Sequence, residues 1–160
     1  MFTKLRLALA LAVAVVAGFS GTALVAQQGH VMANVADAKW GPAPPMLPPG
    51  AEIAVLSGDP TKPMAYSVRL RFPANYNIPA HSHPTDENVT VVSGTFYMGA
   101  GTKLDPTASH PLGVGGYCLV PAGFNHFAYT KTPTTIVLYG QGPVEFKYVN
   151  PADDPRNVKK

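Results

Sequence analysis

The stretch that decides the fold is His81-Ser82-His83-Pro84-Thr85-Asp86-Glu87, which is followed by a glycine at Gly94. Residues two apart on an extended strand point to the same side, so His81 and His83 are expected to share one face. The turn-forming residues that follow can direct Glu87 back toward this face. Two imidazoles and one carboxylate from a short segment therefore predict ligands for one metal ion.

A second stretch supplies a third imidazole. It reads Gly115-Gly116-Tyr117-Cys118-Leu119-Val120-Pro121-Ala122-Gly123-Phe124-Asn125-His126, in which a β-rich run meets a Pro-x-Gly turn. The turn leaves His126 at the start of another predicted strand. His126 is therefore a further candidate metal ligand.

Together, and in this order, the two stretches resemble the two sequence motifs of the cupin superfamily. These motifs contain a histidine pair, a glutamate four residues on and a glycine seven beyond it, and then Gly-x5-Pro-x-Gly-x2-His. The resemblance implies an all-β jelly-roll barrel, or double-stranded β-helix, with the metal in its mouth. The ligands that it implies are His81, His83, Glu87 and His126. The motifs lie within residues 75–130, and compatible strand patterns extend the resemblance to 51–149.

Two positions depart from the family pattern. Asn75 stands where the family usually has glycine, and Thr130 stands where an asparagine often follows the last histidine. Neither position is a metal ligand in the family, and asparagine tolerates left-handed backbone conformations nearly as glycine does. The metal-site interpretation therefore stands.

The composition agrees with one small β-domain. With 160 residues and 46% hydrophobic content, the chain can bury one core and has no room for two. Its 17 prolines and 15 glycines favour short strands joined by tight turns. Alternating or β-branched runs predict nine strands, which indicates a sandwich or barrel. The predicted strands are 51–56, 66–72, 78–83, 88–93, 95–99, 117–120, 126–130, 134–139 and 144–149.

The N-terminus has the layout of a secretory signal peptide. Lys4 and Arg6 precede an apolar run and then small residues, which predicts residues 1–26 as the signal with cleavage after Ala26. We therefore expect a periplasmic or secreted protein with no stable membrane association after cleavage. The alternative is an uncleaved anchor, because residues 7–26 carry no charge and are just long enough to span a bilayer.

The charge balance does not indicate binding to nucleic acid. Loss of residues 1–26 leaves 10 of the 12 basic side chains against 9 acidic ones. Such a nearly neutral domain lacks the basic patch that phosphate contacts require. The single cysteine, Cys118, cannot close a disulfide within the chain.

Two segments flank the predicted barrel. Residues 27–50 form a proline-rich extended leader, which either links the domain to the export signal or straps across the barrel. Trp40, the only tryptophan, is a candidate anchor for such a strap. Residues 150–160 are expected to be a polar C-terminal tail with no role in the core.

The predicted ligand set restricts the metal and the chemistry. Three imidazole nitrogens and one carboxylate oxygen suit one divalent transition metal, namely iron, manganese, nickel, copper or zinc. An octahedral ion would keep two positions for a chelating substrate, dioxygen or water, which predicts an oxygenase or oxidase acting on a small molecule. The alternatives are a metal-dependent isomerase or lyase, and a non-enzymatic binding or sensory protein in which the ion is saturated. Pairing of edge strands predicts a homodimer.

The other candidate residues have ordinary interpretations as well. His30 and His110 are expected to be solvated, with the alternative that His110 borders the mouth of the pocket. Cys118 is expected to be a small buried strand residue, with the alternative that its thiol faces the metal. Arg69 and Arg71 share one face of a strand, where they either bind an anionic substrate or lie on the outer face of the sheet. Four residues could line an apolar cavity but are more often core on β-strands. They are Tyr97, Met98, Phe127 and Tyr129.

Overall fold

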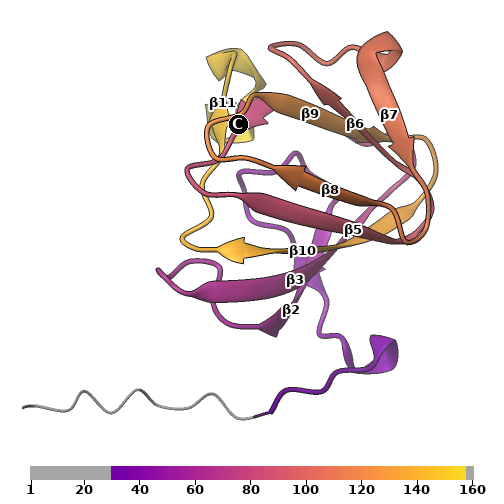
Figure 1. Ribbon diagram of the computed structural model, residues 1–160, viewed down its shortest axis with the longest axis vertical. Coiled ribbons are helices and arrows are strands. Elements are labelled where there is room, and N and C mark those ends of the chain that lie inside the picture. Colours follow the sequence, from indigo (N-terminus) through magenta and orange to yellow (C-terminus); the bar gives the residue numbers. More distant parts are fainter. Residues whose placement is uncertain (1–29, 158–160) are drawn as a thin grey trace, which may run out of the picture. The chain divides into compact units, whose positions relative to one another are not determined.

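A computed structural model describes residues 30–157, which form eleven strands and four short 3-10 turns (Figure 1). The strands are β1 (Gly41–Pro42), β2 (Glu52–Ser57), β3 (Ala65–Phe72), β4 (Asn77–Ser82), β5 (Glu87–Ser93), β6 (Phe96–Ala100), β7 (Ser109–Leu112), β8 (Tyr117–Val120), β9 (His126–Thr130), β10 (Thr134–Gln141) and β11 (Lys147–Tyr148). The turns are η1 (Val35–Asp37), η2 (Pro106–Ala108), η3 (Pro151–Asp153) and η4 (Pro155–Asn157).

The strands form two antiparallel sheets. One sheet has the order β1-β2-β3-β10-β5-β8, and the other has the order β11-β4-β9-β6-β7. From β3 to β6, and again from β8 to β11, consecutive strands alternate between the two sheets (Figure 1). This alternation is the winding of a jelly roll, so the predicted all-β double-stranded β-helix is confirmed.

The core lies between the sheets and follows the alternation of the strands. On β3 the side chains of Val68, Leu70 and Phe72 are buried, on the face opposite Arg69 and Arg71. Phe72 stacks on Phe96 of the other sheet, with ring centroids 5.5 Å apart. Each such buried side chain contributes about 1.5–3 kcal/mol by removal from water.

Eight of the nine predicted strands occur within two residues of their predicted bounds. The prediction for 144–149 was wrong, because only Lys147–Tyr148 forms a strand there. Val144 instead donates its N–H to the Pro60 carbonyl outside any ladder, at 2.8 Å. Strand β7 was missed because Pro111 indicated a loop. A proline is tolerated there since β7 is an edge strand.

Residues 41–50 of the proline-rich leader form a strap against the barrel. Its strand β1 pairs with β2, and Leu47 belongs to the hydrophobic core. The Tyr148 hydroxyl donates to the Met46 carbonyl at 2.7 Å, and the Tyr76 hydroxyl donates to the Pro48 carbonyl. The segment is therefore held by a short ladder, by apolar burial and by two phenols.

Trp40 lies next to the strap on the outer face of the β3 sheet. The Arg71 guanidinium carbon lies 4.4 Å from the centroid of the indole ring, and Arg71 also pairs with Glu52. This arrangement is a cation–π contact supported by a salt bridge. Trp40 thus packs on an arginine rather than on an apolar patch.

The predicted signal peptide lies outside the described residues. Within residues 30–157, no helix is long and apolar enough to cross a membrane.

Candidate metal centre

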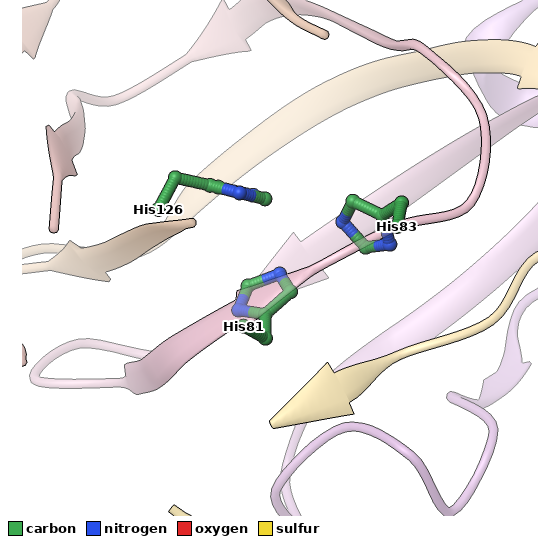
Figure 2. A group of neighbouring side chains, drawn as sticks. All are labelled: His81, His83 and His126. Carbon is green, nitrogen blue, oxygen red and sulfur yellow. The ribbon is translucent and has the colours of Figure 1, made fainter. Parts of the chain in front are cut away.

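Four polar side chains meet between the two sheets. His81 comes from β4, His83 from the residue after it, Glu87 from the start of β5 and His126 from the start of β9. Figure 2 shows the three imidazole rings around a common space. Each histidine offers a ring nitrogen within 4.8 Å of those of the other two. All four residues are buried, with exposed fractions between 2% and 7%.

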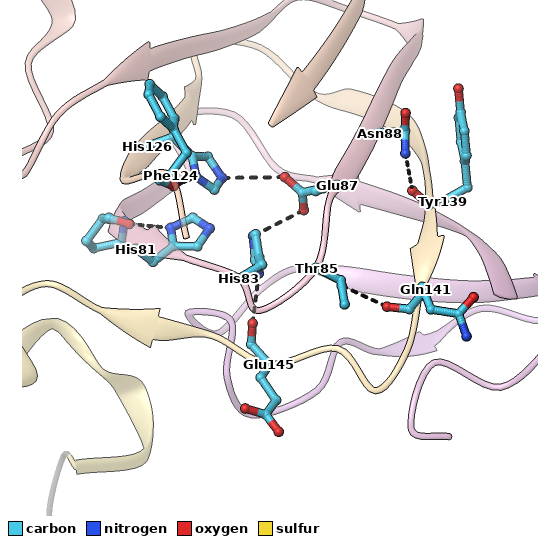
Figure 3. Close-up of polar contacts among 11 residues, drawn as sticks. His81, His83, Thr85, Glu87, Asn88, Phe124, His126, Tyr139, Gln141 and Glu145 are labelled. Carbon is cyan, nitrogen blue, oxygen red and sulfur yellow. Dashed lines mark hydrogen bonds and ion pairs between the residues drawn. The ribbon is translucent and has the colours of Figure 1, made fainter. Parts of the chain in front are cut away.

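Glu87 faces two of these imidazoles (Figure 3). One carboxylate oxygen lies 3.4 Å from His83 Nε2, and the other lies 3.4 Å from His126 Nε2. A charge-assisted hydrogen bond between such groups is usually about 2.7–2.9 Å long. The separations here are longer than that. The Glu87 oxygens and the two Nε2 atoms therefore lie next to one another in the way that neighbouring ligands of one ion do.

The two motifs are joined by main-chain hydrogen bonds. The Gly123 N–H donates to the His83 carbonyl at 2.8 Å, and the Ala122 N–H donates to Asp86 Oδ1 at 2.8 Å. His81 also lies directly opposite His126 in the ladder between β4 and β9. The Pro-x-Gly turn therefore holds the first motif in place as well as starting β9.

Two motif positions that are usually glycine in the family act through the backbone. One is Gly94, and the other is occupied by Asn75. Gly94 has φ +76°, and a Cβ there would lie 2.5 Å from the Pro133 carbonyl oxygen. Asn75 also adopts a left-handed conformation, with φ 58°. The asparagine thus fits where the family usually has glycine. Thr130 is buried and donates its hydroxyl to the Pro73 carbonyl at 2.7 Å.

Hydrogen bonds fix the tautomer of all three histidines. In each, Nδ1 lies within hydrogen-bond distance of a main-chain carbonyl, at 2.7 Å for His81, 2.8 Å for His83 and 3.2 Å for His126. The carbonyls belong to Pro79, Glu145 and Phe124. A carbonyl only accepts, so Nδ1 carries the proton and Nε2 keeps its lone pair. Metal-binding histidines usually have this arrangement.

The electrostatics of the cluster favour neutral imidazole beside ionised carboxylate. Burial, together with repulsion from His126 and His83, lowers the pKa of His81 to about 3. Burial alone would raise the pKa of Glu87. Contacts with the imidazoles of His126, His83 and His81 outweigh burial and hold that pKa well below its usual range.

The cluster leaves polar atoms unsatisfied. His83 Nε2 is buried and has no hydrogen-bond partner among residues 30–157. Burying lone pairs and an anion together is costly unless a cation accepts them. Three imidazole nitrogens and one carboxylate oxygen are a donor set that divalent transition metals accept. The residues therefore fit a metal ion.

Phe146 forms part of the wall of this site and was not identified from the sequence. Its ring stacks on His81, with centroids 4.4 Å apart and an interplanar angle of 12°. The same ring meets the edge of His83 at 4.6 Å. Nothing in the local pattern indicates this role, because the segment resembles an ordinary strand.

Two open spaces lead from the protein surface to the cluster. A groove of about 210 Å³ is lined by His126, Phe124, Cys118 and His110. A wider cleft of about 690 Å³ reaches His83 from the side of β11. Cys118 is half-buried rather than fully buried, and His110 is exposed at the edge of the groove.

The remaining candidates lie away from the cluster. His30 is exposed. Arg71 lies on the outer face of its sheet in a pair with Glu52. Arg69 is on the same face, where its Nε and Nη1 atoms are buried without a hydrogen-bond partner among the described residues.

The four apolar candidates divide between core and cavity. Phe127 is fully buried beneath Gly99, and Tyr97 stacks on Tyr129 with centroids 4.7 Å apart. Met98 lines both the groove and the small interior space beside His81.

The jelly roll and its histidine cluster define a cupin. The sequence matches the ChrR cupin-like domain family over residues 28–145, which is well over half of the chain. The chain therefore belongs to this family of the cupin superfamily. No curated protein matches it.

Solved structures share the fold at low identity. A putative acetylacetone dioxygenase from Methylibium petroleiphilum PM1 has 16% identity and a TM-score of 0.62, covering 82% of this chain and 89% of its own. A polyketide cyclase from Streptomyces resistomycificus has 15% identity and a TM-score of 0.61, covering 79% and 90%. An RmlC-like cupin from Shewanella frigidimarina has 16% identity and a TM-score of 0.56, covering 72% and 93%.

Proposed function

We propose that His81, His83, Glu87 and His126 hold one divalent transition metal, and that the protein is an oxygenase or oxidase acting on a small chelating molecule. One observation carries the proposal. Three Nε2 lone pairs and an ionised carboxylate converge in a buried space, with every Nδ1 already bound to a carbonyl. Iron, manganese, nickel, copper and zinc all accept these donors.

The protein groups have separable roles. The bound ion supplies Lewis acidity or redox activation of a small molecule. The carbonyls of Pro79, Glu145 and Phe124 orient the three imidazoles and keep their protons on Nδ1. Phe146 covers one face of His81 and excludes water from it. Glu87 supplies the negative charge that balances the cation.

The comparisons support this reading by analogy. The structures with the same fold include a putative acetylacetone dioxygenase and a polyketide cyclase, whose names indicate small-molecule substrates. At 15–16% identity the likeness shows the fold alone. Isomerase or lyase chemistry at the same metal differs in needing no dioxygen. Oxygen consumption by the metal-loaded protein with chelating candidates separates these reactions.

A binding or sensory protein is the second candidate. The space directly beside His81, Glu87 and His126 is only about 20 Å³, close to the volume that one water molecule needs. A site of this size favours capture of the ion itself. Tight metal binding without turnover of any chelating compound, in air or under nitrogen, would support this function.

The first experiment is metal analysis of the exported protein by mass spectrometry. We expect about one transition-metal ion per chain in the wild type and less than a tenth of that in the H81A/H83A variant. H110A is the matched control, because His110 is exposed and outside the cluster. Absence of metal from the wild type after reconstitution would overturn the proposal.

We also propose that residues 1–26 direct export and that the mature protein is a periplasmic or secreted homodimer. The charged start, the apolar run and the small residues before Gln27 support export. The exposed edges of the two sheets support pairing between copies. N-terminal sequencing should begin at Gln27, and light scattering should give twice the chain mass.

A further inference from the structure

An apolar cavity of about 100 Å³ adjoins the metal centre. It lies between the inner face of the β3 sheet and the strap, which contributes Met46 to its wall. The cavity shares Leu47, Leu70, Leu138 and Phe146 with the small space at His81, Glu87 and His126. These four side chains therefore form the wall between the cavity and the cluster.

Tyr66 carries the one side-chain polar group in this wall that is not already engaged within residues 30–157. The wall contains one other hydroxyl group, that of Thr61. It donates a hydrogen bond to Asp59 at 2.6 Å. The Tyr66 side chain is 6% exposed, and its hydroxyl is not among the fully enclosed polar atoms that lack a partner in the described part of the chain. The hydroxyl is therefore still accessible, and it can donate a hydrogen bond to a ligand.

A glycine lets Tyr66 lie across the neighbouring strand. Tyr66 on β3 is opposite Gly140 on β10, and Gly140 is opposite Glu87 on β5. A Cβ at Gly140 would lie 3.3 Å from the Tyr66 hydroxyl oxygen. The hydroxyl therefore lies over Gly140, on the same inner row as Glu87.

The phenol is a donor in this position. Burial, with the negative charge of Glu87, raises the pKa of Tyr66. Even at its ordinary pKa a tyrosine is protonated at neutral pH. Its O–H can donate to a ligand oxygen, which a metal ion held by the cluster would also polarise.

We propose that this cavity binds a short-chain carbonyl compound, with its apolar chain between the sheets and its oxygen accepting a hydrogen bond from Tyr66 beside the metal centre. The volume supports a short chain, since an engineered cavity of about 150 Å³ binds benzene. The apolar walls select against sugars and other polyols, whose hydroxyls would have no partners. The inference names the ligand class for the metal site and rests on the proposed function.

The test uses Co²⁺-loaded protein and two chelating probes, acetohydroxamate and hexanohydroxamate, followed by the visible spectrum of the ion. We expect the longer probe to bind at least tenfold more tightly, because each buried methylene adds about 0.8 kcal/mol. Y66F should weaken both probes about three- to tenfold, as loss of one hydrogen bond predicts. Y139F is the matched control, because Tyr139 is exposed on β10.

The outcomes separate the two proposals. No spectral change with either probe would overturn the metal-site function. A spectral change that is the same for both chain lengths, or unaffected by Y66F, would overturn the cavity inference alone.

A second measurement needs no metal. 2-Pentanone is titrated into the metal-free protein while the methyl resonances of Leu70 and Leu138 are followed by NMR, since both residues line the cavity. We expect saturable shifts at these methyls and at least threefold weaker binding to Y66F. Absence of shifts would overturn the inference even if no ion can be loaded.

Discussion

His81 on β4 lies directly opposite His126 on β9, with ring centroids 4.2 Å apart. The pairing joins the first sequence motif to the second through one ladder. Glu87 reaches the same space from the other sheet, so the cluster spans both layers of the barrel. Binding of an ion would therefore tie the two sheets together.

Glu87→Gln tests the negative charge that would balance the cation. The amide keeps the side-chain shape but removes the charge that balances the cation, so we expect metal affinity to fall at least tenfold. The metal-free variant should also have a lower Tm than the metal-free wild type, because the lowered pKa of Glu87 means that the folded state favours the ionised carboxylate. Differential scanning calorimetry with and without metal checks both expectations. An unchanged metal-induced rise in Tm would contradict the role of Glu87.

The metal-free protein should lose stability as the pH falls from about 6.5 to about 3. The unfolded chain protonates His81 near pH 6.5, whereas burial keeps the folded residue neutral down to about pH 3. Between these values the unfolded state binds more protons, so the free energy of unfolding decreases with falling pH. Glu87 adds to the loss below pH 4.5, because its folded pKa is lowered.

Urea unfolding between pH 7 and pH 4 measures this dependence. H81Q removes the titrating group and should flatten the curve, while H110Q should leave it unchanged. A wild-type curve that is as flat as that of H81Q would count against a neutral His81 in the folded protein.

Phe146→Ala should open the metal centre. Loss of the ring that covers His81 should destabilise the protein by about 2 kcal/mol, below the cost for a fully buried phenylalanine. We expect EDTA to remove the metal several times faster than from the wild type. F124A is the comparison, because that ring is 47% exposed at the groove. Equal rates for the wild type and F146A would show that Phe146 does not shield the ion.

Gly94→Ala tests the motif glycine independently of the metal. The added Cβ would lie 2.5 Å from the Pro133 carbonyl oxygen at a φ of +76°, so we expect a loss of about 2–4 kcal/mol. G113A is the control, since a Cβ at Gly113 meets no atom within 4 Å. Chemical denaturation of both variants gives the comparison, and equal stabilities would refute the steric explanation.

Local signals in the sequence were sufficient to predict a β-sandwich or barrel, and the resemblance to the cupin motifs specified the jelly roll. The Pro-x-Gly turn, the alternation of β3 and the spacing of His81 and His83 all act over a few residues. Asn75 could be accepted in place of glycine for the same reason, and its φ of 58° agrees.

The features that the sequence did not predict depend on contacts between distant segments. The carbonyl that orients His83 belongs to Glu145, 62 residues away, and no pattern near His83 indicates it. The row of Tyr66, Gly140 and Glu87 depends on the register of three strands. A slip of one residue would turn these side chains to the other face, so sequence alone leaves the cavity undefined.

The strap changes where the working unit of this protein begins. Met46 and Leu47 enclose the ligand cavity, and they precede β2 and the main barrel. A chain trimmed to start at Ala51 would keep all four candidate ligands yet lose one side of the cavity. If the proposed ligand binds there, such a shortened protein would lack part of its binding site, because Met46 and Leu47 line the cavity. A domain boundary drawn at Ala51 would therefore divide that site.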